Sequence, residues 1–358
     1  MNHVQAIRER LQEKELDAMF LTHQANRFYA TGFASSGTDG AALITRSDAY
    51  YFTDGRYTEA AEKRLSDVFK IGVVTAKRTY SDCVNDVIAS EGLRRVGFED
   101  AAMTVAAYGK YKEKLRCELV SASEILKDLR QVKDADELRA LTDAQRIAEK
   151  ALSEILNDIK PGAVEREIAA KLQYLMLHYG AQDKSFDPIV VSGPNGSLPH
   201  GVPTDREFRS GEFVTMDFGC IYHGYCSDMT RTVAVGYVTD EMRRVYDTVL
   251  QAQLTGIAAA KAGVTGKDVD AAARKVITEA GYGEYFSHSF GHGVGVEIHE
   301  FPNASSVNET PLPSGAVISA EPGIYIPGKL GVRIEDVIVI TDDGRENLMR
   351  APKELLIL

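Results

Sequence analysis

The chain has 358 residues, with 41 Lys and Arg residues against 52 Asp and Glu residues, which gives a formal net charge of −11. Proteins that bind nucleic acids usually carry basic surfaces, so this balance gives no support to that class. No apolar stretch approaches the roughly 18 residues of a membrane span, and the charged N-terminal segment lacks the apolar core of a signal peptide. We therefore expect a soluble, cytoplasmic protein with room for two domains.

The four cysteines are Cys83, Cys117, Cys220 and Cys226, and they form no CxxC pair. Reduced cysteines are the usual state in a cytosolic chain. A bridge between Cys220 and Cys226 stays open as an alternative, because these two residues flank a predicted turn.

Strands alternate with helices over residues 1–130, which predicts a small α/β domain with a mixed sheet. We expect helices at His3–Glu15, Tyr57–Leu65, Asp82–Ser90 and Val105–Leu115. We expect strands at Asp17–Thr22, Ala41–Ile44, Ala49–Thr53, Phe69–Val74, Arg95–Phe98 and Glu118–Val120. This half contains no glycine-rich phosphate-binding motif.

The charged segment Leu129–Glu137 is predicted to be a hinge, followed by an α+β domain over residues 131–358. We expect helices at Ala135–Ile159, Val164–Tyr179, Asp240–Ala262 and Gly266–Ala280, each stopped by glycine or proline. Strands are predicted at Ile189–Ser192, Phe213–Gly219, Cys226–Val235, Ala316–Ala320 and Val332–Ile340. Two helix pairs on one face of a largely antiparallel sheet indicate a pseudo-two-fold arrangement, although no residue-level repeat supports it.

The segment Phe213–Val233 places two aspartates in a predicted hairpin. If the chain folds back between Tyr222 and His223, Asp217 lies directly opposite Asp228. Opposite side chains have Cβ atoms roughly 4.5–5.5 Å apart, and like charges so placed repel. Their neighbours on the same strand faces, Phe213, Thr215, Thr230 and Thr232, carry no positive charge, so we expect a divalent cation between the carboxylates. Two surface aspartates on a hairpin are the alternative.

Other segments add groups that bind metals. Three histidines, at 288, 292 and 299, surround glycines that favour a loop over a helix. Taken one at a time, such histidines and strand-end glutamates are usually ordinary structural residues. Taken jointly, the candidates are Asp217, Asp228, His292, Glu321 and Glu335. This set is too rich in oxygen for a structural zinc site and suits two divalent ions about 3.5–4 Å apart.

The motifs MDFG, SDMTRT, GHGVG, AEPGIY and VRIED occur in this order. They resemble the pita-bread metallopeptidases, in particular the Xaa-Pro branch of aminopeptidase P and prolidase. The resemblance covers essentially the whole chain, with residues 1–130 similar to the creatinase-type N-terminal domain and residues 131–358 similar to the catalytic domain. It implies that the metal ligands are Asp217, Asp228, His292, Glu321 and Glu335, and that the catalytic residues are His200, His288, His299, Glu321 and Arg333.

The resemblance implies an enzyme that releases the N-terminal residue from short peptides with proline in second position. Prolidase, which is restricted to dipeptides, is the alternative, because the motifs do not encode what blocks the chain beyond the proline. The resemblance also implies two divalent ions and a homodimer. Oxygen-rich ligands favour Mn²⁺, with Co²⁺, Zn²⁺ or Fe²⁺ as alternatives.

Other members of the fold are less consistent with the chain. A methionine aminopeptidase would carry the same ligands but usually lacks the first domain, whereas creatinase lacks the metal ligands. A non-catalytic binding module of this fold would have lost ligands, and none of the five is lost here.

Overall fold

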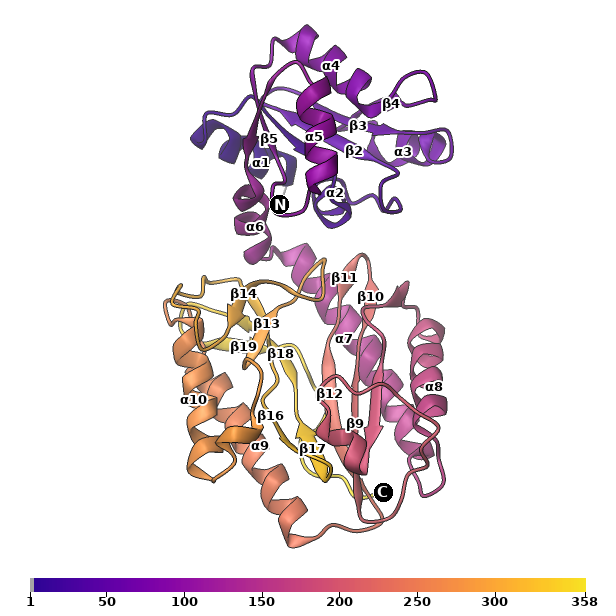
Figure 1. Cartoon of the computed structure of the whole chain (residues 1–358), viewed down its shortest axis with the longest axis vertical. Coiled ribbons are helices and arrows are strands. Elements are labelled where there is room, and N and C mark those ends of the chain that lie inside the picture. The colour runs from indigo at the N-terminus through magenta and orange to yellow at the C-terminus, as the bar shows by residue number, and fades with distance from the viewer. Residues whose placement is uncertain (1–2) are drawn as a thin grey trace. The chain divides into compact units, whose positions relative to one another are not determined.

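The structure is a computed structural model that describes residues 3–358, so Met1 and Asn2 of the predicted first domain lie outside the described residues. The chain divides into a unit that ends at Arg130 and a second unit, Gln131–Leu358 (Figure 1). None of the helices in the described range combines the length and hydrophobicity needed to cross a bilayer.

The first unit alternates helices and strands along the chain. Its helices are α1 (His3–Glu13), α2 (Gln24–Thr31), α3 (Thr58–Leu65), α4 (Tyr80–Glu91), α5 (Val105–Lys114) and α6 (Ser123–Gln131). Its strands are β1 (Ala18–Leu21), β2 (Ala41–Thr45), β3 (Ala49–Thr53), β4 (Lys70–Val73), β5 (Arg95–Phe98) and β6 (Glu118–Ser121).

These strands form one sheet in the order β4-β3-β2-β1-β5-β6. The β1–β2 and β2–β3 pairs are antiparallel, whereas β3–β4, β1–β5 and β5–β6 are parallel, so the prediction of a mixed sheet is confirmed. Apolar side chains of β1, β2 and β5 pack with α4 in the core, for example Phe20, Leu43, Val84 and Val96.

Helices α2 and α6 were not predicted. The buried residues of α2 combine Ala25, Tyr29 and Ala30 with the polar Asn26 and Arg27, so polar residues interrupt its apolar stripe. Arg27 is buried and donates hydrogen bonds to the carbonyls of Thr22 at 2.6 Å and Gly40 at 2.7 Å. A buried guanidinium is tolerated because carbonyl oxygens replace its water.

The second unit begins with a long helix and contains most of the strands. Its helices are α7 (Ala135–Ile155), α8 (Glu165–His178), α9 (Asp240–Ala259) and α10 (Gly266–Glu279), with short 3-10 segments η1 (Leu156–Asp158), η2 (Gly193–Ser197) and η3 (Gly283–Tyr285). Its strands are β7 (Asp183–Lys184), β8 (Ile189–Ser192), β9 (Glu212–Phe218), β10 (Cys220–Tyr222), β11 (Tyr225–Cys226), β12 (Met229–Val235), β13 (Gly291–Gly293), β14 (Glu300–Ala304), β15 (Val317–Ala320), β16 (Gly323–Ile326), β17 (Leu330–Arg333), β18 (Asp336–Ile340) and β19 (Arg345–Asn347).

The strands of the second unit are divided among several sheets, where one sheet was predicted. The sheets are β12-β9-β8, β11-β10-β7, β14-β13-β15-β18-β19 and β16-β17. Helices α7 and α8 pack on the first of these through residues such as Leu172 and Met216. Helices α9 and α10 pack on β15 and β18 through residues such as Val269 and Ile318 (Figure 1). A helix pair followed by antiparallel strands thus occurs twice, as the pseudo-two-fold arrangement requires.

The predicted hinge, Leu129–Glu137, contains the boundary between the two units, and most of its residues belong to the ends of α6 and α7. Helix α6 runs to Gln131, and Asp134 caps α7 by accepting hydrogen bonds from the backbone N–H groups of Asp136 and Glu137. Between them, Lys133 is buried and forms an ion pair with Glu300 at 2.6 Å. The charges of this segment therefore cap a helix and form a buried ion pair.

The hairpin register also differs from the prediction. Asp217 pairs with Thr230, and the turn consists of His223 and Gly224, whose φ angles are 47° and 79°. Two positive φ angles define a type I′ turn, the two-residue turn that matches strand twist. The chain therefore folds back one residue later than predicted. Asp228 lies two residues before Thr230, so it is a diagonal neighbour of Asp217 and not its opposite partner.

We expect Gly224→Ala to destabilise the protein by about 1–2 kcal/mol, because a Cβ atom is strained in the left-handed region. The melting temperature of the full chain should fall by several degrees. Gly344→Ala is the matched control, since a Cβ there meets nothing within 4 Å and its φ is not left-handed. Equal melting temperatures for the two variants would contradict the type I′ turn.

Candidate metal centre

The predicted ligands come from separate segments, and four of the five stand at strand ends. Asp217 is near the end of β9, Asp228 directly precedes β12, and Glu321 directly follows β15. His292 lies in β13, which was predicted to be a loop, and Glu335 lies between β17 and β18. Side chains at strand ends reach beyond the sheet, so ligands from distant segments can meet.

All of these residues line one cavity of about 680 Å³ in the second unit. The cavity also contains the four residues predicted to act only in catalysis: His200, His288, His299 and Arg333. The structure thus brings together every residue proposed from the sequence. The remaining lining includes apolar groups such as Phe186, Pro188, Pro199, Val202, Pro203 and Ile298.

Three side chains approach closely enough to share one ion. Asp228, His292 and Glu335 each offer a ligand atom, and these atoms lie within 4.8 Å of one another. His292 Nε2 is 3.5 Å from Asp228 Oδ2 and 3.2 Å from Glu321 Oε1. The imidazole therefore stands between two carboxylates.

Hydrogen bonds from outside the cluster orient these ligands. His292 Nδ1 lies 3.1 Å from the Gly293 carbonyl, which leaves Nε2 directed at the carboxylates. The Ser319 hydroxyl accepts from the His292 backbone N–H at 3.0 Å and donates to Glu321 Oε1 at 3.1 Å. Gly291 makes this arrangement possible, because a Cβ there would be 2.0 Å from the Ser319 carbonyl oxygen.

Arg333 corrects the expectation that no positive charge neutralises the aspartates. Its Nη2 lies 2.5 Å from Asp217 Oδ2, and the Arg333 side chain is only 4% exposed. Its Nε donates to the Thr230 hydroxyl at 3.0 Å, and that hydroxyl donates to Glu335 Oε2 at 2.8 Å. The cation comes from β17, so a consideration of the hairpin alone could not identify it.

Tyr325 was not proposed from the sequence, although it stands in the AEPGIY motif. Its hydroxyl lies 2.8 Å from both His288 Nε2 and Arg333 Nη1. His288 Nδ1 lies 2.8 Å from the Ser289 carbonyl, so the ring donates from Nδ1 and accepts from Tyr325. Both nitrogens of His288 are thus engaged within the protein, whereas His299 and His200 face the cavity outside this chain of bonds.

Buried Glu165 is a second residue that the sequence did not reveal. Its carboxylate accepts hydrogen bonds from the backbone N–H of Ser192 at 2.7 Å, from the Asn195 amide at 3.1 Å and from the Thr204 hydroxyl at 2.7 Å. These contacts clamp both ends of the loop that carries His200. A glutamate in the first turn of a helix looks like an ordinary capping residue, so no sequence signal distinguishes this role.

Burial and mutual repulsion shift the ionisation of the cluster. Burial, followed by the charge of Asp217, raises the pKa of Asp228 well above its usual value, and burial with the charge of Asp228 does the same to the pKa of Glu335. Burial opposes the charge on His292, but its hydrogen bond to Glu321 and the nearby carboxylates raise its pKa to about 9. Burial likewise opposes ionisation of Glu321, yet His292 lowers its pKa to about 2.

The residues fit divalent cations. Asp217 Oδ1 and Glu335 Oε1 are buried, and within residues 3–358 neither accepts a hydrogen bond. A buried oxygen without a partner costs about 1–3 kcal/mol, more when it is charged. Two such carboxylates beside Asp228 and His292 are compensated when a cation accepts their lone pairs. The donor set, carboxylates with one imidazole, suits Mn²⁺ or a similar ion.

We expect the metal-free protein to lose stability as pH rises from 6.5 to 9. The folded pKa of His292, about 9, lies above its unfolded value, so its contribution is complete below pH 6.5 and is lost through pH 9. The raised pKa values of Asp228 and Glu335 act in the same direction. The shift of His292 alone corresponds to about 3 kcal/mol.

Calorimetry of the chelated protein between pH 6.5 and 9.5 measures this loss. His292→Gln should have a flatter pH profile, and added Mn²⁺ should stabilise the protein more at high pH, where protons compete less for the ligands. A parent protein as insensitive to pH as His292→Gln would contradict the charged pair of His292 and Glu321.

Comparisons with known proteins agree with this geometry. The profile of metallopeptidase family M24 matches residues 139–342, and that of the creatinase/prolidase N-terminal domain matches residues 3–132. The Xaa-Pro dipeptidase of Pyrococcus furiosus is 38% identical over 97% of each chain.

Solved structures are similar over nearly their whole length. The Xaa-Pro dipeptidase from Bacillus anthracis superposes with a TM-score of 0.94 at 42% identity, covering 99% of each chain. The X-Pro aminopeptidase from Thermotoga maritima superposes with a TM-score of 0.91 at 34% identity, covering 98% of this chain and 100% of its own. The predicted combination of a creatinase-like domain and a pita-bread domain is therefore confirmed, and the chain belongs to metallopeptidase family M24.

Proposed function

We propose that this protein is a two-metal Xaa-Pro dipeptidase. The observation that carries the proposal is the convergence of five predicted ligands in one cavity, with buried carboxylate oxygens of Asp217 and Glu335 that lack partners among residues 3–358. Relatives named Xaa-Pro dipeptidase, from Pyrococcus furiosus and Bacillus anthracis, support the dipeptidase over the aminopeptidase favoured by the sequence.

The proposed ligands of the two ions are Asp217, Asp228, His292, Glu321 and Glu335. When bound, divalent ions polarise a carbonyl group and lower the pKa of water towards about 7. Manganese is the proposed metal, because oxygen ligands prevail in the site.

Glu321 is the proposed proton shuttle. It lines the cavity, and its carboxylate accepts a hydrogen bond from the Ser319 hydroxyl at 3.1 Å, so it would be placed to accept a proton from the attacking water. It would then transfer this proton to the leaving nitrogen of proline. That nitrogen carries no N–H in the peptide, so the site cannot recognise the bond through a donor there. Recognition instead requires a surface that fits the proline ring, and the apolar lining near Pro188 and Val202 provides one.

The three histidines are proposed to have two kinds of role: two would contact the substrate, and the third would hold other residues of the site. His299 and His200 face the cavity and would contact the scissile carbonyl and the proline side. Burial lowers the pKa of His299, with the neighbouring His292 acting in the same direction, so its ring is neutral and donates through one nitrogen. His288 would act through Tyr325 and Arg333, because its own nitrogens are engaged.

An Xaa-Pro aminopeptidase is the second candidate. The similarity to the Thermotoga maritima X-Pro aminopeptidase favours it, since that structure covers nearly the whole of this chain. The two candidates differ only in whether residues beyond the proline are accepted. The homodimer and the cytoplasmic location stay predictions.

Substrate length decides between the two candidates. With Mn²⁺ restored after chelation, we expect kcat/KM for Xaa-Pro dipeptides to exceed that for Xaa-Pro-Xaa tripeptides by at least about tenfold, or 1.4 kcal/mol. Acetylated dipeptides serve as the control, because the free α-amino group is expected beside the acidic cluster. A preference for tripeptides would establish the aminopeptidase, and absence of hydrolysis of any Xaa-Pro bond would remove both.

We expect His299→Ala to lower kcat by about 10²–10³, the loss observed when one donor to a developing oxyanion is removed. Its metal content should equal that of the parent, because His299 is not a proposed ligand. His178→Ala is the control, since His178 ends α8 and does not line the cavity. Unchanged kcat with full metal content would exclude the proposed role of His299.

A further inference from the structure

Glu335 stands where two strands separate. Strand β17 ends at Arg333 and β18 begins at Asp336, so Glu335 belongs to neither ladder. Its backbone N–H donates to the Thr230 carbonyl at 3.1 Å, and its carboxylate accepts from the Thr230 hydroxyl at 2.8 Å. One residue of β12 thus holds both the main chain and the side chain of this proposed ligand.

Arg231 supplies the hydrogen bond that a neighbouring strand would otherwise give. Its Nη1 donates to the Glu335 carbonyl and, at 2.9 Å, to the Thr230 carbonyl. Its Nη2 pairs with Asp336 Oδ1 at 2.9 Å, where the two side chains are 4% and 0% exposed. The remaining donors of Arg231 reach the carbonyls of Pro352 at 2.9 Å and Ala351 at 2.8 Å.

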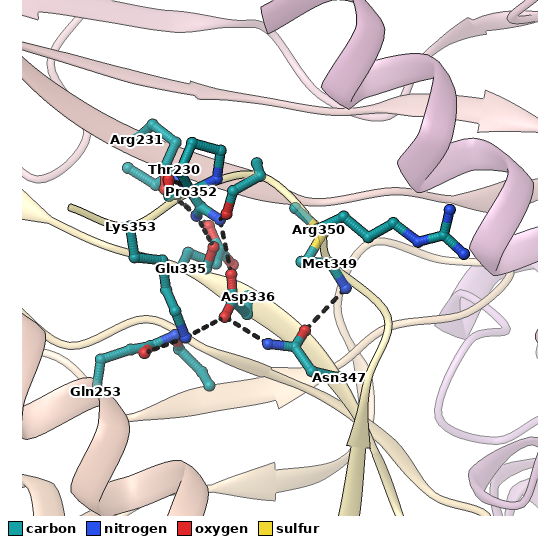
Figure 2. Close-up of polar contacts among 12 residues, drawn as sticks. Thr230, Arg231, Gln253, Glu335, Asp336, Asn347, Met349, Arg350, Pro352 and Lys353 are labelled. Atoms are coloured by element: carbon teal, nitrogen blue, oxygen red, sulfur yellow. Dashed lines mark hydrogen bonds and ion pairs between the residues drawn. The ribbon is translucent and has the colours of Figure 1, made fainter. Parts of the chain in front are cut away.

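Asp336 connects this arginine to the C-terminal segment. Asp336 Oδ2 accepts from Lys353 Nζ and from the Asn347 amide, each at 2.7 Å (Figure 2). Lys353 Nζ also donates to the Gln253 side chain at 3.1 Å. Asp336 directly follows Glu335 in the sequence. Figure 2 shows Arg231 and Lys353 on different sides of the Asp336 carboxylate.

We propose that Arg231, Asp336 and Lys353 form a positioning network that fixes Glu335 for metal binding and ties it to the C-terminal segment. The network contains two cations and one anion, placed behind a cavity with an excess of carboxylates. Strand alternation directs Asp336 away from the cavity, so the network touches no substrate. The proposal rests on the metal site of the proposed function.

Packing alone does not explain this arrangement. A buried ion pair is on average no more stable than apolar side chains of similar volume, so its presence calls for a further reason. All five donors of Arg231 are used: one reaches the Thr230 carbonyl, and the other four reach Glu335, its sequence neighbour Asp336 and the tail residues Ala351 and Pro352. Partners that hold metal ligands from behind typically change metal affinity 10–100-fold when they are removed.

The test compares Lys353→Met and Asp336→Asn with the parent in the full chain. Lys171→Met is the matched control, because Lys171 forms a pair with Asp158 at the same 2.7 Å but lies outside the cavity and the network. The metal-free proteins are titrated with Mn²⁺ by calorimetry, and bound Mn²⁺ is followed by electron paramagnetic resonance. Melting temperatures of the metal-free forms report on folding.

We expect at least one Mn²⁺ ion to bind 10–100-fold more weakly in Lys353→Met and Asp336→Asn, with an altered resonance spectrum and parent affinity in Lys171→Met. Excess Mn²⁺ should restore kcat, and KM for the dipeptide should stay within about twofold.

Parent affinity and spectrum in both variants, with only a lower melting temperature, would overturn the proposal. An equal loss of affinity in Lys171→Met would do the same. If Asp336→Asn fails to fold, Lys353→Met still decides, because the Lys353 side chain is 20% exposed and its loss leaves Arg231 paired. A parent protein that binds no Mn²⁺ would instead refute the metal site of the proposed function.

Discussion

The concentration of negative charge in one buried cavity is the constraint on which the rest of the second unit depends. Asp217, Asp228, Glu321 and Glu335 line this cavity, and among residues 3–358 their charge is opposed there by Arg333 and by His292, whose pKa is raised to about 9. Ionised carboxylates out of water are costly unless they are paired. Burial and repulsion therefore raise the pKa values of Asp228 and Glu335 well above their usual range, and the unsatisfied oxygens of Asp217 and Glu335 indicate where cations fit.

The repeated arrangement of helix pairs and strands explains how the carboxylates are kept close together despite their repulsion. The first repeat supplies Asp217 and Asp228 from β9 and the start of β12, and the second supplies His292, Glu321 and Glu335 from the strands around β15 and β18. Each sheet is fixed by the apolar contacts of its own helix pair. The apolar packing of two separate hydrophobic cores therefore opposes the repulsion between the ligands, and no single helix or strand has to do so alone.

The sequence predicted the elements and the members of the site better than their contacts. Alternation and glycine stops located most helices and strands, because those signals are local. The predicted register of the hairpin was wrong. Whether Tyr222 and His223 belong to a strand or to the turn depends on backbone angles that composition does not specify. Arg333 was assigned to the site through a motif, but its pairing with Asp217 joins residues 116 positions apart. Tyr325 and Glu165 were missed for the same reason, because their roles arise only when distant loops meet.

Neutral groups outside the cluster orient three of the ligands. Gly293 and Ser319 fix His292, Ser319 also holds Glu321, and Thr230 holds Glu335. A fourth ligand, Asp217, is held by the Arg333 guanidinium. A site whose ligands are held in these ways is largely formed before an ion arrives, so less binding free energy is spent on ordering side chains. Repulsion between the carboxylates opposes this arrangement. Protons relieve that repulsion when the ion is absent. Proton and metal ion therefore compete for the same cavity, and both the acidity and the stability of the domain follow from that competition.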